Sequence, residues 1–283
     1  MYDQTFSRDN PGCIVFLLDR SDSMKQVWQG SGGTLADGAA RALNKILLEL
    51  CLKSIKEVGG DARHYFDVGV FGYGACPVAG GEGVESALGG ALTGQSIVPI
   101  PQLFNSPLAI REEPSADAMS AKVPVWVEPM HGYRTPMCQA IAVAGGHVFD
   151  WASAHPHSFP PIVINITDGL VTDSPHEGAE LADWANRLTT IETSDGPALL
   201  LNIFLSPSTA TEVLFPTSAA QLPDPGPELF AISSPLPKAM VANARASLVK
   251  VDEGARGFVF NAGLPTLVKF LEIGTRVAEI RDR

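Results

Sequence analysis

The sequence predicts an α/β protein whose doubly wound, mostly parallel central sheet has helices on both faces. Three short, mainly apolar segments lie at residues 13–18, 162–166 and 198–205. Segments of this kind are typical of strands buried on both faces of a parallel sheet. Helical segments separate them, and strand-helix-strand repetition implies right-handed crossovers between parallel strands. We find no internal repeat and no linker, so we expect a single domain over residues 1–283.

The segment after the first strand predicts a long helix. Thr34 is followed three residues later by Asp37, which resembles a helix-capping box with Asp in place of Glu. Apolar residues then recur with helical spacing until a Gly-Gly pair, so we expect a helix over about residues 35–57. The next strand, at residues 64–72, is expected to lie beside the first and to end in a Gly-Tyr-Gly turn at residues 72–74.

The second half of the chain continues the alternation. A capping box with Pro at the first helical position is predicted at residues 174–177, and it opens a helix that continues to about residue 193. The other elements expected in this half are helices at residues 136–151, 238–248 and 264–280 and a strand at residues 257–261.

Two stretches interrupt the alternation, at residues 75–130 and 206–237. The first is long for one connection and is rich in Gly and then in Pro. Because it leads back to the loop that contains Thr135, it either shapes the choice of partner or is a surface elaboration. The second contains seven prolines, which forbid a regular helix or a central strand, but its aromatic-apolar pairs predict an ordered loop packed on the body. These pairs are Leu214-Phe215 and Leu229-Phe230.

Short oxygen-bearing side chains follow the first strand. Asp19, Ser21 and Ser23 occupy alternate positions in the loop directly after it. Loops at the carboxyl ends of parallel strands are where open α/β sheets bind ligands. Carboxylate and hydroxyl oxygens of this reach suit a small, hard cation such as Mg²⁺. The loop is therefore a candidate metal site, although Asp and Ser are also common in ordinary turns.

Two later segments carry the same kind of side chain. A turn ends in Thr135, whose hydroxyl is expected to cap a helix that begins at Pro136. A second buried strand ends in Asp168, and Gly169 after it lets the backbone pass close to a bound ion. Two strand-end loops and one helix-start loop thus supply oxygen ligands.

These residues resemble the metal-ion-dependent adhesion site of the von Willebrand factor type A (VWA) domains. That site is built from Asp-x-Ser-x-Ser, a distant Thr and a distant Asp, which match Asp19, Ser21, Ser23, Thr135 and Asp168 in chain order. The resemblance implies that the two Ser and the Thr bind Mg²⁺ directly, with Mn²⁺ or Ca²⁺ as alternatives, and that the two Asp act through water. It also implies a Rossmann-like fold with one antiparallel edge strand in the first irregular stretch.

The resemblance leaves two classes of function open. In the first, the protein is a metal-dependent binding module that captures a carboxylate of a partner protein. Stand-alone bacterial members of the family, such as the tellurite-resistance-associated VWA proteins, resemble scaffold or assembly subunits that work beside ATPases, kinases or phosphatases. In the second, the ion supports hydrolysis of a phosphoester, but both acids would be occupied with the ion and no histidine is placed to act as a general base. We therefore expect a binding protein and not an enzyme.

Charge and composition exclude other partners. The net charge of −11 argues against non-specific nucleic-acid binding, which needs a basic surface. No apolar run approaches the length of a membrane span, and the first residues lack the basic and apolar regions of a signal peptide. The four cysteines have no C-x-x-C spacing and are expected to be buried free thiols. We expect a cytoplasmic protein with no membrane and no nucleic-acid partner.

Other chemistry has weaker support. The chain contains no Gly-x-x-x-x-Gly-Lys-Ser/Thr stretch for a nucleotide phosphate, and the Gly-Tyr-Gly sequence lacks the third Gly of a dinucleotide site. His155 and His157 flank a proline in a connection, where solvated histidines are commoner than metal ligands. Asp22 lies where the VWA family often has Gly, and we expect its carboxylate to point away from the ion.

Overall fold

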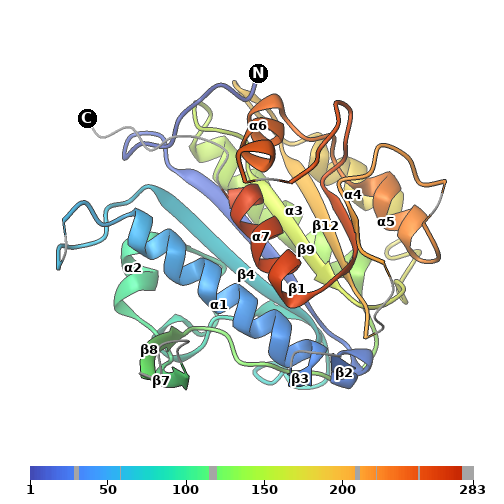
Figure 1. Cartoon of the computed structure of the whole chain (residues 1–283), viewed down its shortest axis with the longest axis horizontal. Helices are drawn as coiled ribbons and strands as arrows, with labels where there is room; N and C mark the ends of the chain where they lie inside the picture. Colours follow the sequence, from blue (N-terminus) through green and yellow to red (C-terminus); the bar gives the residue numbers. More distant parts are fainter. Residues whose placement is uncertain are drawn as a thin grey trace.

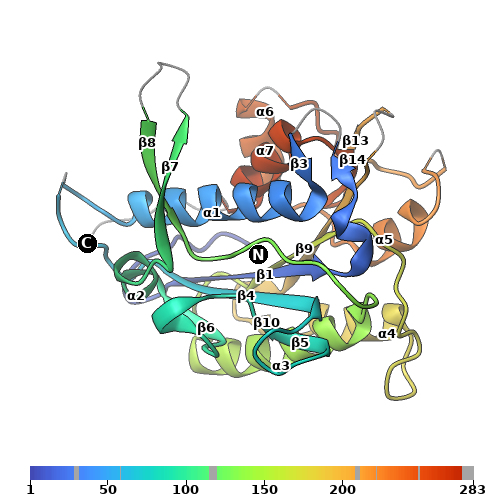
Figure 2. The same cartoon turned by 90° about the horizontal axis from the view of Figure 1, so that it is seen from below.

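In the computed structural model, the chain forms three layers, a central sheet with helices on both faces (Figure 1). The view in Figure 2 shows the sheet between the two helical layers. The predicted fold class is therefore confirmed. The residues that the structure describes are 1–28, 32–57, 59–114, 120–207, 211–220, 222–247 and 249–275.

In the described part of the chain, the main sheet has eight strands in the order β13-β14-β12-β9-β1-β4-β5, and β6 also pairs with β4. The five strands from β14 to β4 are parallel. β5 and β6 run antiparallel to β4, which confirms the predicted antiparallel edge, and β13 pairs antiparallel with β14 at the other edge. The strands are β1 (Gly12–Arg20), β4 (Phe66–Ala75), β5 (Glu82–Ser86), β6 (Ile97–Pro99), β9 (Ile162–Thr167), β12 (Leu199–Leu205), β13 (Val213–Leu214) and β14 (Phe258–Ala262).

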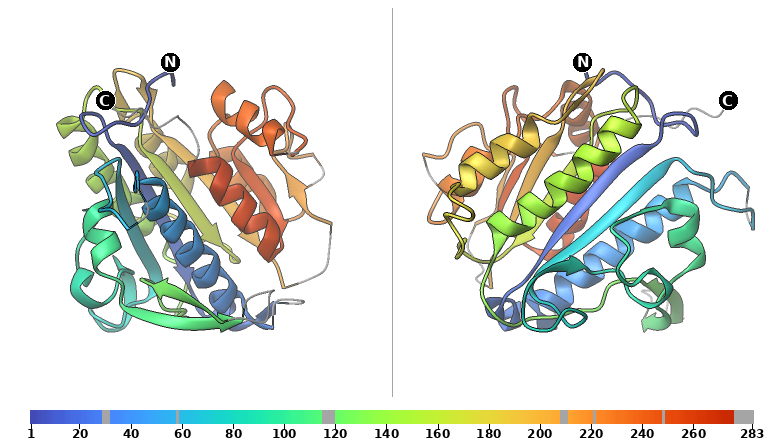
Figure 3. Two further views of the ribbon diagram at one scale, coloured as in Figure 1. Left: turned by 60° about the vertical axis from the view of Figure 1, so that its left-hand side comes forward. Right: turned by 180° about the vertical axis from the view of Figure 1, so that it is seen from behind.

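Helices cover both faces of this sheet (Figure 3). Side chains of β1 alternate between the two faces, because successive residues of a strand point in opposite directions, and each face has its own apolar cluster. On one face lie α1 (Leu35–Lys53), α6 (Lys238–Ala246) and α7 (Leu264–Thr275), with α2 (Ile100–Asn105) beside β4. On the other lie α3 (Met137–Ala154), α4 (Leu181–Thr189) and α5 (Gly226–Ile232).

Short elements complete the described structure. A two-stranded ribbon, β7 and β8, projects from the body on the side of α1 (Figure 2). The ribbon strands are β7 (Ala109–Pro114) and β8 (Ser120–Val125), and the other short elements are η1 (Asp22–Lys25), β2 (Val27–Trp28), β3 (Gly33–Thr34), η2 (Gly90–Leu92), β10 (Glu192–Thr193) and β11 (Gly196–Pro197). The insertion predicted at residues 75–130 thus contains β5 to β8, with α2 between β6 and β7.

The N-terminus of α1 has the predicted capping box. The hydroxyl of Thr34 accepts a hydrogen bond from the backbone N–H of Asp37 at 3.1 Å, and the Asp37 carboxylate accepts one from the backbone N–H of Thr34 at 2.8 Å. These bonds satisfy amide groups that have no partner within the helix. The helix ends at Lys53, four residues earlier than the expected boundary.

The Gly-Tyr-Gly sequence lies inside β4 and is not the turn predicted from the sequence. Gly72 and Gly74 pair in register with Leu18 and Arg20 of β1. A Cβ atom on Gly72 would lie 2.5 Å from Nε of Arg20, and one on Gly74 would lie 2.7 Å from the Arg20 carbonyl carbon. Both glycines are therefore explained by the space that Arg20 occupies against the neighbouring strand, and not by chain reversal.

Two other expectations are wrong. The chain after Ser174 forms a turn, and α4 begins at Leu181, with the Ser174 hydroxyl accepting the Leu181 N–H at 3.1 Å and contacting Glu180. Glu180 and Asp183, rather than Ser174 and Glu177, form the capping box. In the proline-rich stretch, α5 forms a regular helix, because a Pro in the first turn of a helix removes no internal hydrogen bond.

The expected anchors of the proline-rich stretch are largely buried. Phe215, Leu229 and Phe230 are at most 9% exposed, whereas Leu214 is 37% exposed. The four cysteines are free and buried, as predicted. Among the described residues, no helix is both long enough and apolar enough to cross a membrane.

Candidate metal centre

The five residues expected to bind metal meet at the carboxyl edge of the sheet. Asp19 is near the end of β1, and Asp168 directly follows β9, which pairs with β1 in parallel register. Ser21 and Ser23 lie in the loop and in η1 after β1, and Thr135 lies just before α3. The parallel pairing brings strand ends that are distant in the sequence to one place (Figure 1).

Hydrogen bonds connect the two strand-end loops. Oδ1 of Asp19 accepts a hydrogen bond from the backbone N–H of Ser21 at 2.7 Å. The hydroxyls of Ser21 and Ser23 are 3.0 Å apart, and the Ser23 hydroxyl donates to Oδ1 of Asp168 at 2.7 Å. Four of the five residues therefore form one continuous chain of short contacts.

Thr135 joins this group around Gly169. A Cβ atom built on Gly169 would lie 3.3 Å from Oγ1 of Thr135, 3.5 Å from Oγ of Ser23 and 3.8 Å from Oδ2 of Asp19. Oxygens from two of the loops thus converge beside Gly169 of the third. A glycine there keeps the space between these oxygens free of a side chain.

Burial disfavours the charged form of both carboxyl groups of the site. Burial, together with the charge of Asp19, raises the pKa of Asp168 to about 7. Burial also raises the pKa of Asp19, although hydrogen bonds from Thr167 and Ser21 act in the opposite direction. Among the described residues, Oδ2 of Asp168 is buried without a hydrogen-bond partner. A cation between the two groups would offset both penalties.

The donor set fits a hard cation that prefers oxygen ligands. It consists of two carboxylates and three hydroxyls, and it includes the unpartnered oxygen of Asp168. Within the described ranges, no group of three or more His, Cys, Asp or Glu side chains could hold a metal. The oxygen-rich set is typical of Mg²⁺ or Ca²⁺ sites and not of zinc sites, which use nitrogen and sulfur.

Thr135 does not cap α3 through its side chain, in contrast to the sequence-based expectation. The Asp173 carboxylate takes that role, because it accepts the backbone N–H groups of Cys138 at 3.0 Å and Gln139 at 2.9 Å. The hydroxyl of Thr135 is therefore not used at the helix end and lies beside Gly169. Asp173 was missed because it caps the helix from a distant loop.

The loop before α3 is held in place from two sides. The backbone N–H of Thr135 donates to the hydroxyl of Thr172 at 2.9 Å, and the Thr172 N–H donates to the Thr135 carbonyl at 3.1 Å. The carbonyl of Tyr133, a residue with φ of 66°, accepts the N–H of Asp22 at 2.9 Å. These contacts fix the loop to both strand-end loops.

A buried hydroxyl orients Asp19. Thr167 donates to Oδ2 of Asp19 at 2.6 Å and is itself fully buried. The phenol of Tyr73, on β4 beside β1, also interacts with Thr167. Burial raises the pKa of Tyr73 well above the ordinary value. Both oxygens of Asp19 thus have fixed donors. Thr167 was not predicted because the motif specifies Asp168 and not the residue before it.

Further buried polar groups continue from Tyr73 across the sheet. The Tyr73 hydroxyl donates to Oδ1 of Asn165 at 2.7 Å, and Nδ2 of Asn165 donates to Oδ1 of Asn202 at 3.0 Å. Nδ2 of Asn202 donates to the hydroxyl of Ser233 at 2.9 Å. The side chains from β4, β9, β12 and the end of α5 therefore form a buried polar chain that reaches the candidate site.

Two other sequence-based expectations concern Asp22 and the histidines, and one further residue was not predicted. Asp22 is exposed and pairs with Lys25 at 2.6 Å, so its carboxylate is engaged at the surface. His155 stacks on Trp151 with ring centroids 4.4 Å apart, and His157 is exposed. Arg20 was not predicted to matter, but it is 3% exposed, and its Nη1 lies 3.9 Å from Oε1 of Glu85.

Comparisons with known proteins add little to this geometry. No family model matches the sequence, and no curated protein matches it. A solved structure with similarity is described as the crystal structure of the ArnB paralog VWA2 from Sulfolobus acidocaldarius, with 12% identity and a TM-score of 0.36. The match covers 72% of this chain and 36% of that one. A similarity this low supports no conclusion about fold or function. The fold described above rests on the strand order of this chain.

Proposed function

We propose that this chain is a VWA-type binding module that uses a divalent cation to capture a carboxylate of a partner protein. Asp19, Ser21, Ser23, Thr135 and Asp168 would hold the cation, with Mg²⁺ as the first choice and Mn²⁺ or Ca²⁺ as alternatives. The observation that carries the proposal is the convergence of the Asp19, Ser23 and Thr135 oxygens around Gly169, together with the buried Oδ2 of Asp168, which has no partner in the described structure.

The residues of the site have separable roles in this proposal. Asp168 and Asp19 supply the negative charge, and their mutual repulsion favours cation binding. The hydroxyls of Ser21, Ser23 and Thr135 supply neutral oxygens and leave the net charge of the site at −2 with both acids ionised. When bound, the cation supplies a coordination position that a carboxylate oxygen of a partner can take.

A phosphoester hydrolase is the alternative, and we favour binding because both acids of the site would be occupied with the ion. Hydrolysis needs a general base within hydrogen-bonding reach of the attacking water. In the described structure the histidines that hydrogen-bond to side chains do so elsewhere, His64 with Asp67 and His157 with Ser194. Turnover of a generic phosphoester with Mg²⁺ or Mn²⁺ would support the hydrolase instead.

The partner class and cellular setting are also proposals. The resemblance to stand-alone bacterial VWA proteins suggests an assembly subunit that works beside an ATPase, a kinase or a phosphatase. Four buried free cysteines are compatible with a reducing compartment such as the bacterial cytoplasm.

Metal binding can be tested by stability. At a tenfold excess of Mg²⁺ or Mn²⁺ over the dissociation constant, the free energy of unfolding should increase by about 1.4 kcal/mol, which raises the melting temperature by a few degrees. Asp168→Ala should abolish this response, whereas Asp150→Ala, a change of an exposed acid on α3, should keep it. An unchanged melting temperature with metal and with chelator would contradict the proposal.

Partner capture can be tested separately with Thr135→Ala. The hydroxyl of Thr135 is not used to cap α3, so the variant should fold with near-native circular dichroism. It should nevertheless lose metal-dependent capture of the partner that wild type retains from native lysate in Mg²⁺ and releases in chelator. Full capture by the variant, or equal capture in chelator, would show that the metal edge is not the binding surface.

A further inference from the structure

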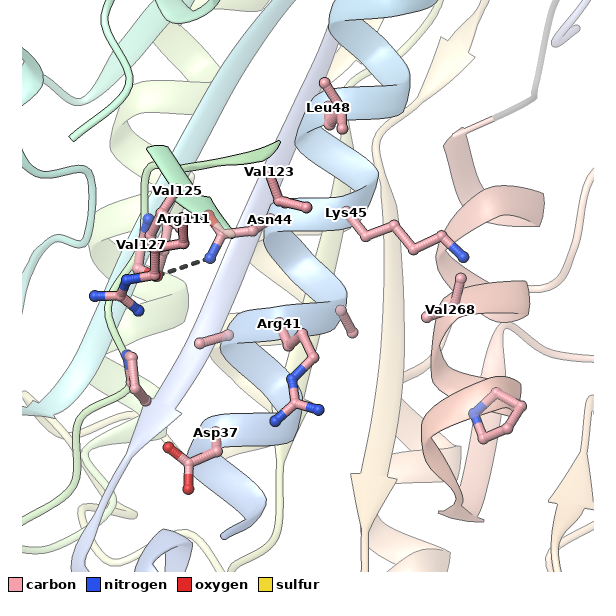
Figure 4. Close-up of a pocket in the computed structure, with 14 residues that line it drawn as sticks. Asp37, Arg41, Asn44, Lys45, Leu48, Arg111, Val123, Val125, Val127 and Val268 are labelled. Carbon is pink, nitrogen blue, oxygen red and sulfur yellow. Dashed lines mark hydrogen bonds between the residues drawn. The ribbon is translucent and has the colours of Figure 1, made fainter. Parts of the chain in front are cut away.

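A groove of about 1110 Å³ lies outside the candidate metal centre, along the exposed face of α1. Figure 4 shows α1 in the middle of the groove, with residues from the end of the β7–β8 ribbon on one side and α7 on the other. The ribbon wall includes Val123, Val125 and Val127, and the helical wall includes Pro265 and Val268. The groove is therefore lined on both sides by apolar side chains.

Cationic side chains are placed among these apolar groups. Arg41 and Lys45 project from successive turns of α1 and are both exposed (Figure 4). Their spacing of four residues puts them on the same face of the helix. Arg111 adds a third cation from the ribbon, although it also pairs with Glu128.

The shape of the groove is fixed by Asn44 on α1. Its Nδ2 donates to the carbonyl of Val127 at 2.8 Å, and its Oδ1 accepts the backbone N–H groups of Trp126 at 2.8 Å and Val127 at 3.1 Å. Asn44 is 6% exposed, so these bonds are shielded from water. The indole of Trp126 in turn donates to the carbonyl of Leu103 at 2.7 Å. The ribbon wall is therefore held against α1 before any ligand arrives, which lowers the cost of ordering on binding.

The charge of the groove is opposite to that of the whole chain. The chain has a net charge of −11, yet the lining of the groove contains three cations and a single acid, Asp37. The carboxylate of Asp37 is engaged by Thr34, whose backbone N–H holds the pKa of that carboxyl below its usual value, and the nearby charge of Arg41 lowers it further. Asp37 thus offsets part of the charge of Arg41, and a bound molecule can neutralise the rest together with the charge of Lys45.

We propose that this groove binds an acidic segment of a partner protein in which apolar residues alternate with Asp or Glu. Val125 and Val127 are buried within the wall, so the apolar residues would lie between the partly exposed Val123 and Val268, and the acids would pair with Arg41 and Lys45. Recognition of this kind, an amphipathic segment in an apolar groove with charged margins, is common among protein-binding modules. This surface goes beyond the proposed metal-dependent function and needs no bound metal.

Other ligands fit the groove less well. A nucleic acid requires an extended basic surface, and three cations in a chain of this net charge do not supply one. Small-molecule sites enclose most of their ligand, whereas this groove runs along an exposed helix face. An acidic peptide segment with apolar residues matches the apolar walls of the groove and the cations between them.

The test is selection from a phage-displayed library of random peptides on the full chain, with chelator present throughout. Chelator removes any contribution of the candidate metal centre, so failure here and failure of metal binding are separate results. We expect the selected peptides to be acidic and to contain apolar residues. Their affinity should fall about tenfold in the double variant Arg41→Glu and Lys45→Glu, and it should weaken as the salt concentration rises.

Two further variants keep the test specific. Lys238→Glu reverses one charge, half the change of the double variant, on the exposed start of α6 and should leave the affinity unchanged. The neutral pair Arg41→Gln and Lys45→Gln should give a smaller loss, and melting temperatures of all variants check that they fold. Basic or neutral selected peptides, equal affinity for the charge-reversed variant, or a self-associating chain whose dimer the double variant breaks, would overturn the proposal.

Discussion

Two carboxylates near opposite ends of the sheet differ in how completely they are hydrogen-bonded. Asp67, at the start of β4, is 5% exposed, with Oδ1 at 2.6 Å from Nε2 of His64 and Oδ2 accepting the indole N–H of Trp151 at 2.9 Å. Asp168, just after β9, accepts a side-chain hydrogen bond at Oδ1 from Ser23, but its Oδ2 is buried and has no partner in the described structure.

This difference separates a structural acid from a candidate ligand. Burial alone does not distinguish them, since Asp67 is also buried. What distinguishes Asp168 is that the fold provides no donor for one of its oxygens and places a second acid, Asp19, close enough to raise its pKa. A buried polar atom without a partner is costly, and a cation bound at this strand end would offset that cost.

The largest expected effect is that one substitution, Asp→Asn, acts in opposite directions at the two positions. Asp67→Asn places an amide N–H₂ against the donors of His64 or Trp151 and should lower the free energy of unfolding by about 2 kcal/mol. Asp168→Asn, measured in chelator, removes a disfavoured charge and should raise it by about 1 kcal/mol. Urea titrations of both variants and of wild type measure these changes. Equal destabilisation by the two substitutions would remove the distinction.

A smaller effect is expected from the residue that orients Asp19. Thr167→Val keeps the shape of the side chain but removes the hydroxyl that donates to Oδ2 of Asp19, and it should weaken metal binding about tenfold. Thr167→Ser retains the hydroxyl and should restore the wild-type affinity. Isothermal titration calorimetry with Mg²⁺ or Mn²⁺ measures both. Equal affinity in the Val and Ser variants would show that the hydrogen bond does not position the ligand.

The smallest expected effect concerns pH and the structural acid. The hydrogen bond to Asp67 raises the pKa of His64 above the ordinary histidine value of about 6.5. The folded state therefore binds the proton more tightly than the unfolded chain, so this contribution is complete below about pH 6.5 and is lost as pH rises through the folded-state pKa. His64 is partly exposed, which keeps the contribution small.

The measurement is the free energy of unfolding of wild type and His64→Gln on either side of that range. Wild type should lose more stability than the variant as pH increases from about 6 to about 8. An identical pH dependence in the two proteins would show that the contact with Asp67 does not stabilise the charged imidazole.

The sequence predicted the parts of the fold that depend on local pattern. Thr34 and Asp37 identified the start of α1, because a capping box is a contact between near neighbours. The predicted start of α4 was wrong, because Ser174 and Glu180 interact across a turn that no local spacing indicates. The predicted role of Gly72 in a turn was also wrong, since its actual role depends on Arg20 of another strand.

The positions of the candidate site residues were predictable from a sequence motif, but the groups that support them were not. Its five residues form a recognisable motif, and parallel pairing of β1 with β9 brings four of them together. Their supporting groups were not predictable, because Asn165 and Asn202 lie within mainly apolar segments, where a lone polar residue gives no sign of its partner. The groove along α1 also depends on how a ribbon from the irregular stretch packs against the helix.

Asn165 and Asn202 have one more consequence, for the alignment of the strands. They are direct partners in the pairing of β9 with β12, and their amides bond to each other on the same face of the sheet. A shift of β9 by one residue would turn every side chain of that strand to the opposite face and leave both amides unpaired inside the protein. The amide pair therefore specifies the alignment of β9 along β12, and with it the position that Thr167 and Asp168 reach beside Asp19.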